Sequence, residues 1–420
     1  MLKSKFFKNN LIYLAGTVFA GFLGYLFHFV VSRRLSVAEY GQLQSLLSLS
    51  AIFGVANSAL SYFSVKHTAV FAAHDDFQAS ENFLEYLLPK VWKYALAFVI
   101  IILTLSPFFA RLLHFSTYLG FFAVSFASLF SIIAVPYQEI LRGWHKFFLL
   151  TSVGVITAFV KLFVGAGIAL ASPGAASISF SIFVSAIFSW YLAHHLSRRL
   201  ITKKGNKSSL EKNFWRDKYF SETGIRKTAQ KIFVFSLFVV LITNIDVILV
   251  KYFSSPDIAG YFGAFNLLGK IILWLNLAVV AVMLPEACAA GHSKKKPGSK
   301  KILLSYGFIA AISISIISFF RIFPDFTINL FFGEKYIFDP SLLWIFGFFS
   351  FLISILTLEA NLAFARHDWR VNFFLAATLF LMVVGIGFYH ASLTQIVSVF
   401  SAVFLIGYTT ILGLNLYSAT

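Results

Sequence analysis

Residues 243–286 read TNIDVILVKYFSSPDIAGYFGAFNLLGKIILWLNLAVVAVMLPE, and this stretch decides the fold class. Two apolar segments flank a short polar loop, and they belong to apolar runs at roughly 230–251 and 259–284. A helix needs about 20 apolar residues to cross a bilayer. The stretch therefore predicts two neighbouring membrane-spanning helices, with the charges of Asp246 and Lys270 placed inside them.

The composition extends this prediction to the whole chain. Of 420 residues, 59% are hydrophobic and 12% are charged, whereas soluble domains are about half apolar and a quarter charged. Outer-membrane barrels are excluded because their strands alternate apolar and polar residues. The single cysteine, Cys288, excludes an internal disulfide and a metal site with several cysteines. We interpret the chain as an all-α polytopic membrane protein.

Twelve apolar runs predict twelve membrane spans. They are roughly 11–31, 42–65, 91–110, 117–139, 147–171, 175–197, 230–251, 259–284, 302–322, 342–364, 370–389 and 393–416. The second run is rich in Ser and Gln, which is typical of a helix that faces a polar cavity rather than lipid.

The basic residues predict the orientation of the chain. If the N-terminus is cytoplasmic, 26 of the 34 Lys and Arg fall in cytoplasmic segments and 6 in outer segments, counted with the adjoining span ends. The remaining two, Lys161 and Lys270, fall inside spans. Cytoplasmic loops carry the excess of Lys and Arg in membrane proteins. We therefore expect both termini in the cytoplasm, and the net charge of +17 reflects topology and contact with anionic lipids.

A basic segment at 198–229 divides the chain into an N-terminal bundle, 1–197, and a C-terminal bundle, 230–420. Its basic residues alternate with Leu, Phe, Trp and Tyr, which predicts a cytoplasmic amphipathic segment lying on the membrane surface. We interpret this segment as a lipid-contacting linker rather than as a nucleic-acid site.

The two bundles carry similar loops. After span 1 the chain reads RRLSVAEYG, residues 33–41, and after span 7 it reads KYFSSPDIAG, residues 251–260. Aligning Ser36 with Ser254 places the loops 218 residues apart. Six spans separate them, so the copies share one orientation, as in a parallel repeat whose halves rock to give alternating access. The alternative is a chance likeness of two short loops.

Three charges lie within the predicted spans. Lys161 shares a helix face with Thr157 in span 5, and Lys270 shares one with Asn266 in span 8. Charges at such depth face a bundle interior or a water-filled cavity, so these four residues are candidates for a substrate cavity; the alternative is a buried ion pair that fixes packing. Asp246 is a candidate for binding a coupling proton or cation, or for pairing with Lys270, Lys161 or the nearby Lys251.

Other charges lie at predicted span ends. Arg33 and Arg34 are further candidates for the substrate path, although interfacial snorkelling and a loop ion pair with Glu39 are the simpler explanation.

Two acids have basic neighbours at helical spacing. Glu139 and Arg142 lie three residues apart, which predicts a local ion pair. Glu359 is a second candidate for ion coupling, and Arg366, two turns further on, offers it a local partner.

The sequence contains no HExxH, no GxSxG and no phosphate-binding loop. We therefore expect no enzymatic activity and no bound cofactor or metal. We interpret the His194-His195 pair as interfacial.

Three stretches resemble the polysaccharide and oligosaccharidyl-lipid flippases of the multidrug/oligosaccharidyl-lipid/polysaccharide exporter (MOP) superfamily, in particular the O-antigen and teichoic-acid exporters. They are residues 16–49, residues 143–170 and, most specifically, residues 243–286. The resemblance covers most of the chain, weakly beyond span 8. It also implies basic residues at the positions of Lys161 and Lys270.

The resemblance implies a function and a cellular location. Such proteins move an oligosaccharide linked through diphosphate to a polyprenyl lipid across the cytoplasmic (inner) membrane, alongside the polysaccharide biosynthesis machinery. A drug/cation antiporter of the same superfamily is one alternative, although the mid-membrane charges here are mainly basic. A membrane polysaccharide polymerase or glycosyltransferase is another, but such enzymes usually carry a sizeable outer loop. The lipid II flippases differ mainly in cargo.

No nucleotide-binding motif is present, so we expect coupling to a proton or sodium gradient or to the membrane potential.

Overall fold

The computed structural model describes residues 2–115, 117–202, 223–292, 299–366 and 368–417. Every regular element in these ranges is helical. Eleven described helices are long and apolar enough to cross a membrane, or twelve if the pair 306–322 and 324–332, bent by 93°, forms one span. This agrees with the polytopic all-α architecture predicted from the apolar runs.

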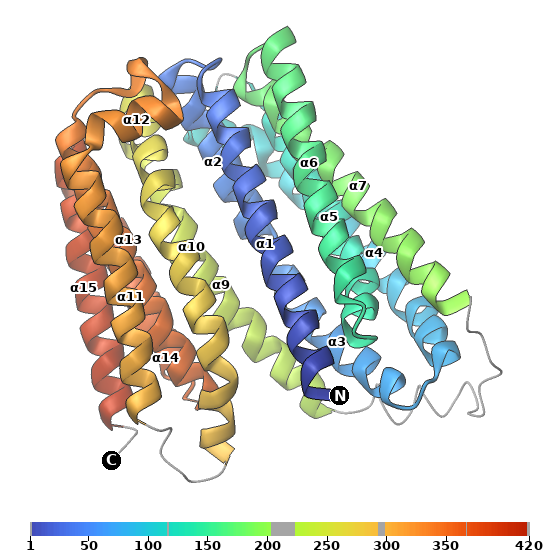
Figure 1. Cartoon of the computed structure of the whole chain (residues 1–420). Helices are drawn as coiled ribbons and strands as arrows, with labels where there is room; N and C mark the ends of the chain where they lie inside the picture. Colours follow the sequence, from blue (N-terminus) through green and yellow to red (C-terminus); the bar gives the residue numbers. More distant parts are fainter. Residues whose placement is uncertain (1, 116, 203–222, 293–298, 367, 418–420) are drawn as a thin grey trace. The chain divides into compact units, whose positions relative to one another are not determined.

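Contacts within the chain divide it into two compact units (Figure 1). We call Met1–Leu35 with Leu49–Ser236 the N-terminal unit, and Ser36–Ser48 with Leu237–Thr420 the C-terminal unit. The expected linker, 198–229, is described only at its ends, so the amphipathic segment expected at its centre lies outside the described residues.

The N-terminal unit contains six long helices besides the end of α2. They are α1 (Leu2–Ser32), α3 (Ala56–Ala73), α4 (Phe77–Leu112), α5 (Leu119–Gly143), α6 (Phe147–Ala171) and α7 (Ala175–Thr202). Helix α5 is the central helix: it packs against α3, α4 and α7, while α1 lies along α6 (Figure 1). The burial of α5 among three neighbours explains how it can carry polar side chains that lipid would not tolerate.

The C-terminal unit is built around α13 (Leu343–Ala365), which packs against α10, α11 and α15. The other elements are α9 (Thr223–Phe253), which belongs to this unit from Leu237 on, α10 (Pro256–His292), α11 (Ser299–Ile322), α12 (Pro324–Phe332), two short 3₁₀ helices (Glu334–Tyr336 and Pro340–Leu342), α14 (Val371–Phe388) and α15 (Leu393–Tyr417).

Several helices extend beyond the apolar runs that predict them. Span 3 is expected at 91–110, but α4 begins fourteen residues earlier, at Phe77. Its start is set by Asp76, whose carboxylate accepts a hydrogen bond from the Ala79 amide at 2.8 Å and so caps the helix. Hydropathy locates only the apolar part of such a helix, because the cap and the polar first turns carry no apolar signal.

The second span is present as one candidate span, Val37–Ala73, with a short break inside it. The expected run at 42–65 falls on α2 (Val37–Phe53) and α3, separated by a break at residues 54–55. Residues 36–48 belong to the C-terminal unit, where Tyr40 is fully buried and its ring makes edge contacts with Phe332 and Tyr336 at 5.6 and 5.7 Å. Near this cluster, outside the spans, burial lowers the pKa of Lys335, and the adjacent Glu39 carboxylate opposes that change.

The two similar loops form equivalent helix starts, but their register differs from the expected one. The Glu39 carboxylate accepts bonds from the Ser36 amide and hydroxyl at 3.2 Å, and Ser36 Oγ accepts from the Glu39 amide, which makes a capping box at the start of α2. At the start of α10, Ser255 Oγ accepts from the Ile258 amide at 3.4 Å. The equivalent of Ser36 is therefore Ser255, not Ser254, because the capping serine must directly precede the helix.

This register places equivalent residues against each other. Gly41 and Gly260 are both the fifth residue after the capping serine, and α2 and α10 approach closely there. A Cβ on Gly260 would lie 2.1 Å from the Val37 carbonyl oxygen, and one on Gly41 would lie 2.7 Å from the Gly260 nitrogen. One turn further, Gln44 donates to the carbonyl of Gly263 at 3.3 Å. The two similar loops thus lead into helices that pack closely against each other inside the C-terminal unit.

Candidate functional site

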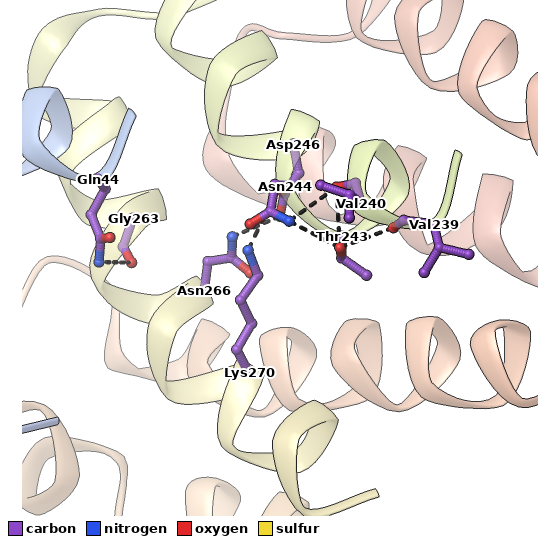
Figure 2. A network of polar contacts seen from close by, with 9 residues as sticks. All are labelled: Gln44, Val239, Val240, Thr243, Asn244, Asp246, Gly263, Asn266 and Lys270. Atoms are coloured by element: carbon purple, nitrogen blue, oxygen red, sulfur yellow. Dashed lines mark hydrogen bonds and ion pairs between the residues drawn. The ribbon is translucent and has the colours of Figure 1, made fainter. Parts of the chain in front are cut away.

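The C-terminal unit brings three of the expected site residues together. Asn266 donates a hydrogen bond to Asp246 Oδ2 at 2.6 Å, and Lys270 Nζ lies 3.8 Å from Asp246 Oδ1. Figure 2 shows these side chains of α9 and α10 directed toward one another. Asp246 is 0% exposed and Asn266 is 1% exposed. Of the partners considered for Asp246, the structure selects Lys270.

Neighbouring polar groups on α9 bind their own helix instead. Thr243 donates to backbone carbonyls one turn back, at Val239 and Val240, and Asn244 donates to Val240 and to Thr243 (Figure 2). The buried Asp246 carboxylate already matches the charge of Lys270. This arrangement resembles a structural ion pair more than an open anion site.

Lys161 has a different environment in the N-terminal unit. It lies on α6, partly buried, with its Nζ 4.5 Å from the centre of the Phe27 ring of α1. His28, also of α1, is 9% exposed and interacts electrostatically with Lys161. Among the residues that the structure describes, no carboxylate lies within ion-pair distance of Lys161. An unmatched ammonium inside a span is costly, and an anion beside it would lower that cost.

One turn before Lys161, Thr157 lines a polar cavity of about 420 Å³ in the N-terminal unit. Helices α2, α3, α5 and α7 supply the rest of the lining, including four residues of the serine-rich second span that is expected beside a polar cavity. The lining residues are Ser50, Asn57, Ser58, Ser61, Ala127, Ser131, Val135, Gln138, Glu139, Thr157, Ile182, Ser185, Ala186 and Ser189.

Glu139 is the one acid in this cavity. The expected ion pair with Arg142 is present, at 3.0 Å, and the same carboxylate oxygen accepts from Ser61 at 2.7 Å. The residue is 3% exposed, and its second oxygen, Oε2, is buried without a hydrogen-bond partner. Sequence reasoning treats Glu139 as a local ion pair and misses its place in the cavity. Two signals were available, its position in a serine-bearing helix and the serine-rich span opposite.

Arg33 and Arg34 are not among the residues that line the cavity of the N-terminal unit. The Arg33 guanidinium stacks over the Phe29 ring at 3.8 Å, and Arg34 is exposed. The carboxylate of Glu39 forms the capping box described above, which accounts for that acid locally.

Glu359 lies in α13 and is 1% exposed. Asn415 of α15 donates to both its carboxylate and its backbone carbonyl. Arg366 donates to the Asn415 carbonyl at 3.0 Å. Asn415 thus stands between Glu359 and the partner expected from the sequence, and this network packs α13 against α15.

Comparison with known proteins identifies the fold. No protein-family model matches the sequence, and a search of curated proteins finds no match. Solved structures do match. An inward-facing MATE multidrug resistance transporter of the MOP superfamily has a TM-score of 0.70 at 11% identity, over 96% of this chain and 97% of that one. The lipid II flippase MurJ in an inward closed conformation has a TM-score of 0.70 at 13% identity, over 96% and 87%.

A third match is a MOP superfamily transporter from Pyrococcus furiosus, whose binding pocket is described as having reversed polarity. Its TM-score is 0.61 at 12% identity, over 97% of this chain and 95% of that one. Identities this low establish architecture and leave the cargo open. The chain has the fold of the MOP superfamily transporters.

Proposed function

We propose that this protein flips a polyprenyl-diphosphate-linked oligosaccharide across the cytoplasmic membrane for surface polysaccharide export. The observation that carries the proposal is Lys161, a cation inside a predicted span with no carboxylate partner among the described residues. A diphosphate is the matching ligand, because ammonium–phosphate hydrogen bonds are about twice as strong as neutral ones. The likeness to a lipid II flippase supports a lipid-linked cargo.

The chemistry of this cargo explains why a polar path is needed. Glycan hydroxyls and a diphosphate are costly to place in hydrocarbon without partners, whereas a polyprenyl tail is not. A cavity with many hydroxyl groups beside a free ammonium gives the headgroup both kinds of partner, while the tail stays in lipid. Alternating access of the two units, as in repeat-built transporters, then completes the translocation.

A drug/cation antiporter is the second candidate, and two observations favour it. A MATE transporter matches this fold with the same TM-score as the lipid II flippase, 0.70, and the cavity contains the Glu139 carboxylate with one oxygen free of hydrogen bonds. An organic cation would approach that oxygen, but Arg142 already matches the carboxylate charge, and the unmatched Lys161 one turn from the cavity would repel the cation.

We further propose that an ion gradient or the membrane potential drives transport, with Asp246 and Glu359 as the candidate coupling groups. One charge that crosses 100 mV gains about 2.3 kcal/mol, which biases a two-state equilibrium roughly fifty-fold. Both acids are buried and hydrogen-bonded to an asparagine, so loss or gain of a proton or cation would change the packing of their helices.

Reconstitution tests the function directly. Purified protein in vesicles is supplied with a fluorescent polyprenyl-diphosphate oligosaccharide, and a membrane-impermeant quencher reports the fraction that changes leaflet. We expect flipping above protein-free vesicles, and slower flipping by Lys161→Met at equal protein level. Transport of a cationic dye with no lipid flipping would reject the proposal in favour of the antiporter. Flipping that persists after every gradient and the potential are collapsed would reject the coupling.

A further inference from the structure

Several donors in the polar cavity of the N-terminal unit are already bound within the protein. Asn57 already donates to Ser131 at 2.8 Å, Gln138 donates to Ser189 at 3.2 Å, and Ser61 donates to Glu139. The hydroxyls of Ser58 and Ser185 donate to carbonyls of their own helices, as does that of Thr157. The named hydroxyl protons and one N–H of each amide are therefore used, while each hydroxyl oxygen keeps acceptor capacity.

Two acceptor atoms of the cavity residues have no hydrogen-bond partner. They are Glu139 Oε2 and Asn57 Oδ1, and both atoms are buried. A buried acceptor without a partner is costly, so a ligand that supplies O–H or N–H groups would be stabilised here. A diphosphate that joins a lipid to a sugar offers acceptors alone at neutral pH, so it cannot satisfy these two atoms.

The charge of the cavity distinguishes between the remaining donors. Glu139 is the single acid of the lining, and its charge is matched by Arg142 at 3.0 Å. A cavity that is neutral overall favours a neutral donor-rich ligand over an organic cation, which would need the carboxylate unpaired. Sugar hydroxyls meet this requirement, since each is a donor and an acceptor.

The position of the cavity relates it to Lys161. Thr157 lines the cavity, and Lys161 follows it by four residues on the same face of α6, a rise of about 6 Å along the helix. That spacing is short enough for a diphosphate and the sugar bonded to it to contact both places at once.

We propose that this cavity is a sugar subsite that binds the saccharide residue nearest the diphosphate, while Lys161 binds the diphosphate. The inference rests on the proposed function, since it assigns the glycan end of that cargo to named residues. Asn57, Glu139 and the serines of α5 and α7 accept from the sugar hydroxyls. The volume of about 420 Å³ lies in the range of small-molecule sites, roughly 300–1,000 Å³.

Binding to purified protein in nanodiscs tests the inference. The probes are polyprenyl diphosphate alone, the same lipid carrying glucose, galactose or N-acetylglucosamine, and tetraphenylphosphonium as an organic cation. For wild type we expect at least one glycosylated lipid to bind about 10-fold more tightly than the bare lipid, as two hydrogen bonds would give. Asn57→Leu removes an acceptor and Ala186→Leu fills the cavity; both should reduce this ratio to less than twofold without changing the Kd of the bare lipid.

Two controls separate the subsite from the diphosphate site and from general damage. Ala171→Leu adds the same side chain at an exposed position at the end of α6, outside the cavity, and should keep the wild-type ratio. Lys161→Met should weaken the bare and the glycosylated lipid by the same factor. Only variants whose unfolding temperature equals that of wild type are compared.

The outcomes distinguish the two proposals. If wild type binds no lipid, the proposed function fails. If the bare lipid binds but no sugar strengthens it, the function stands and the sugar subsite is rejected, because the cavity then holds only water. If tetraphenylphosphonium binds and Asn57→Leu and Glu139→Gln abolish that binding, the cavity is an organic-cation site and the inference is overturned.

Discussion

The contrast between the two intramembrane lysines gives the sharpest prediction. Lys270 is matched by Asp246, which is fully buried, while Lys161 contacts the ring of Phe27 and no described carboxylate. Replacing each lysine by methionine removes the charge and keeps an unbranched apolar side chain. We expect Lys270→Met to reduce stability and Lys161→Met to reduce ligand binding.

The magnitudes follow from the partners. Breaking a buried ion pair costs about 3–5 kcal/mol because the other charge is left unmatched. The 3.8 Å separation and the retained bond from Asn266 place Lys270→Met near the lower figure. Lys161→Met loses a cation–π contact of about 0.5–2 kcal/mol, but it also relieves the desolvation of an unmatched ammonium. Its folding stability should stay constant or rise.

The effect of Lys161→Met on binding is separate. A hydrogen bond to a charged group contributes about 1.5–3 kcal/mol, so the Kd for polyprenyl diphosphate should rise about 10- to 100-fold. Lys270→Met should change that Kd less than threefold in the folded fraction.

Unfolding of detergent-purified protein, followed by tryptophan fluorescence, measures the stability, and nanodisc binding measures the Kd. The double variant Asp246→Asn/Lys270→Met is the control, and it should recover most of the lost stability because no unmatched charge remains. The reasoning is refuted if Lys161→Met destabilises the protein as much as Lys270→Met does, or if it leaves the Kd unchanged.

Three further predictions test packing and topology. Gly260→Ala places a Cβ 2.1 Å from a backbone oxygen and should destabilise the protein by about 1–3 kcal/mol. Gly167→Ala has open space around it and should stabilise the protein by about 0.5–1 kcal/mol. Chemical unfolding compares the two variants, and equal effects would contradict the close approach of α2 and α10. Asn415→Leu removes the donor to a buried carboxylate and should cost about 1–3 kcal/mol by the same measurement; an unchanged stability would show that another group replaces it. In a Cys288→Ser background, Ser172→Cys should react with an impermeant maleimide on intact cells, and labelling only after permeabilisation would reverse the predicted topology.

The architecture was accessible from the sequence because a bilayer requires long apolar helices, and these are visible in the order of residues. The helix ends were less accessible. The start of α4 depends on the cap at Asp76, and the break between α2 and α3 depends on residues 54–55, neither of which changes the hydropathy.

The candidate site was accessible in part. The positions of Lys161, Lys270 and Asp246 inside spans follow directly from the sequence, and so does the Glu139–Arg142 pair at helical spacing. The cavity could not be predicted residue by residue, since its lining comes from five helices and depends on how their faces turn toward one another.

The sequence by itself determined that charges lie at membrane depth, because their number and spacing are properties of the chain. Only the tertiary structure decided what each charge does. Lys270 is neutralised because α9 and α10 bring Asp246 within 3.8 Å of it, and Lys161 is not, because the helix beside it presents a phenylalanine ring. Two lysines that look alike in sequence differ because the energy of a buried charge depends on the groups packed around it.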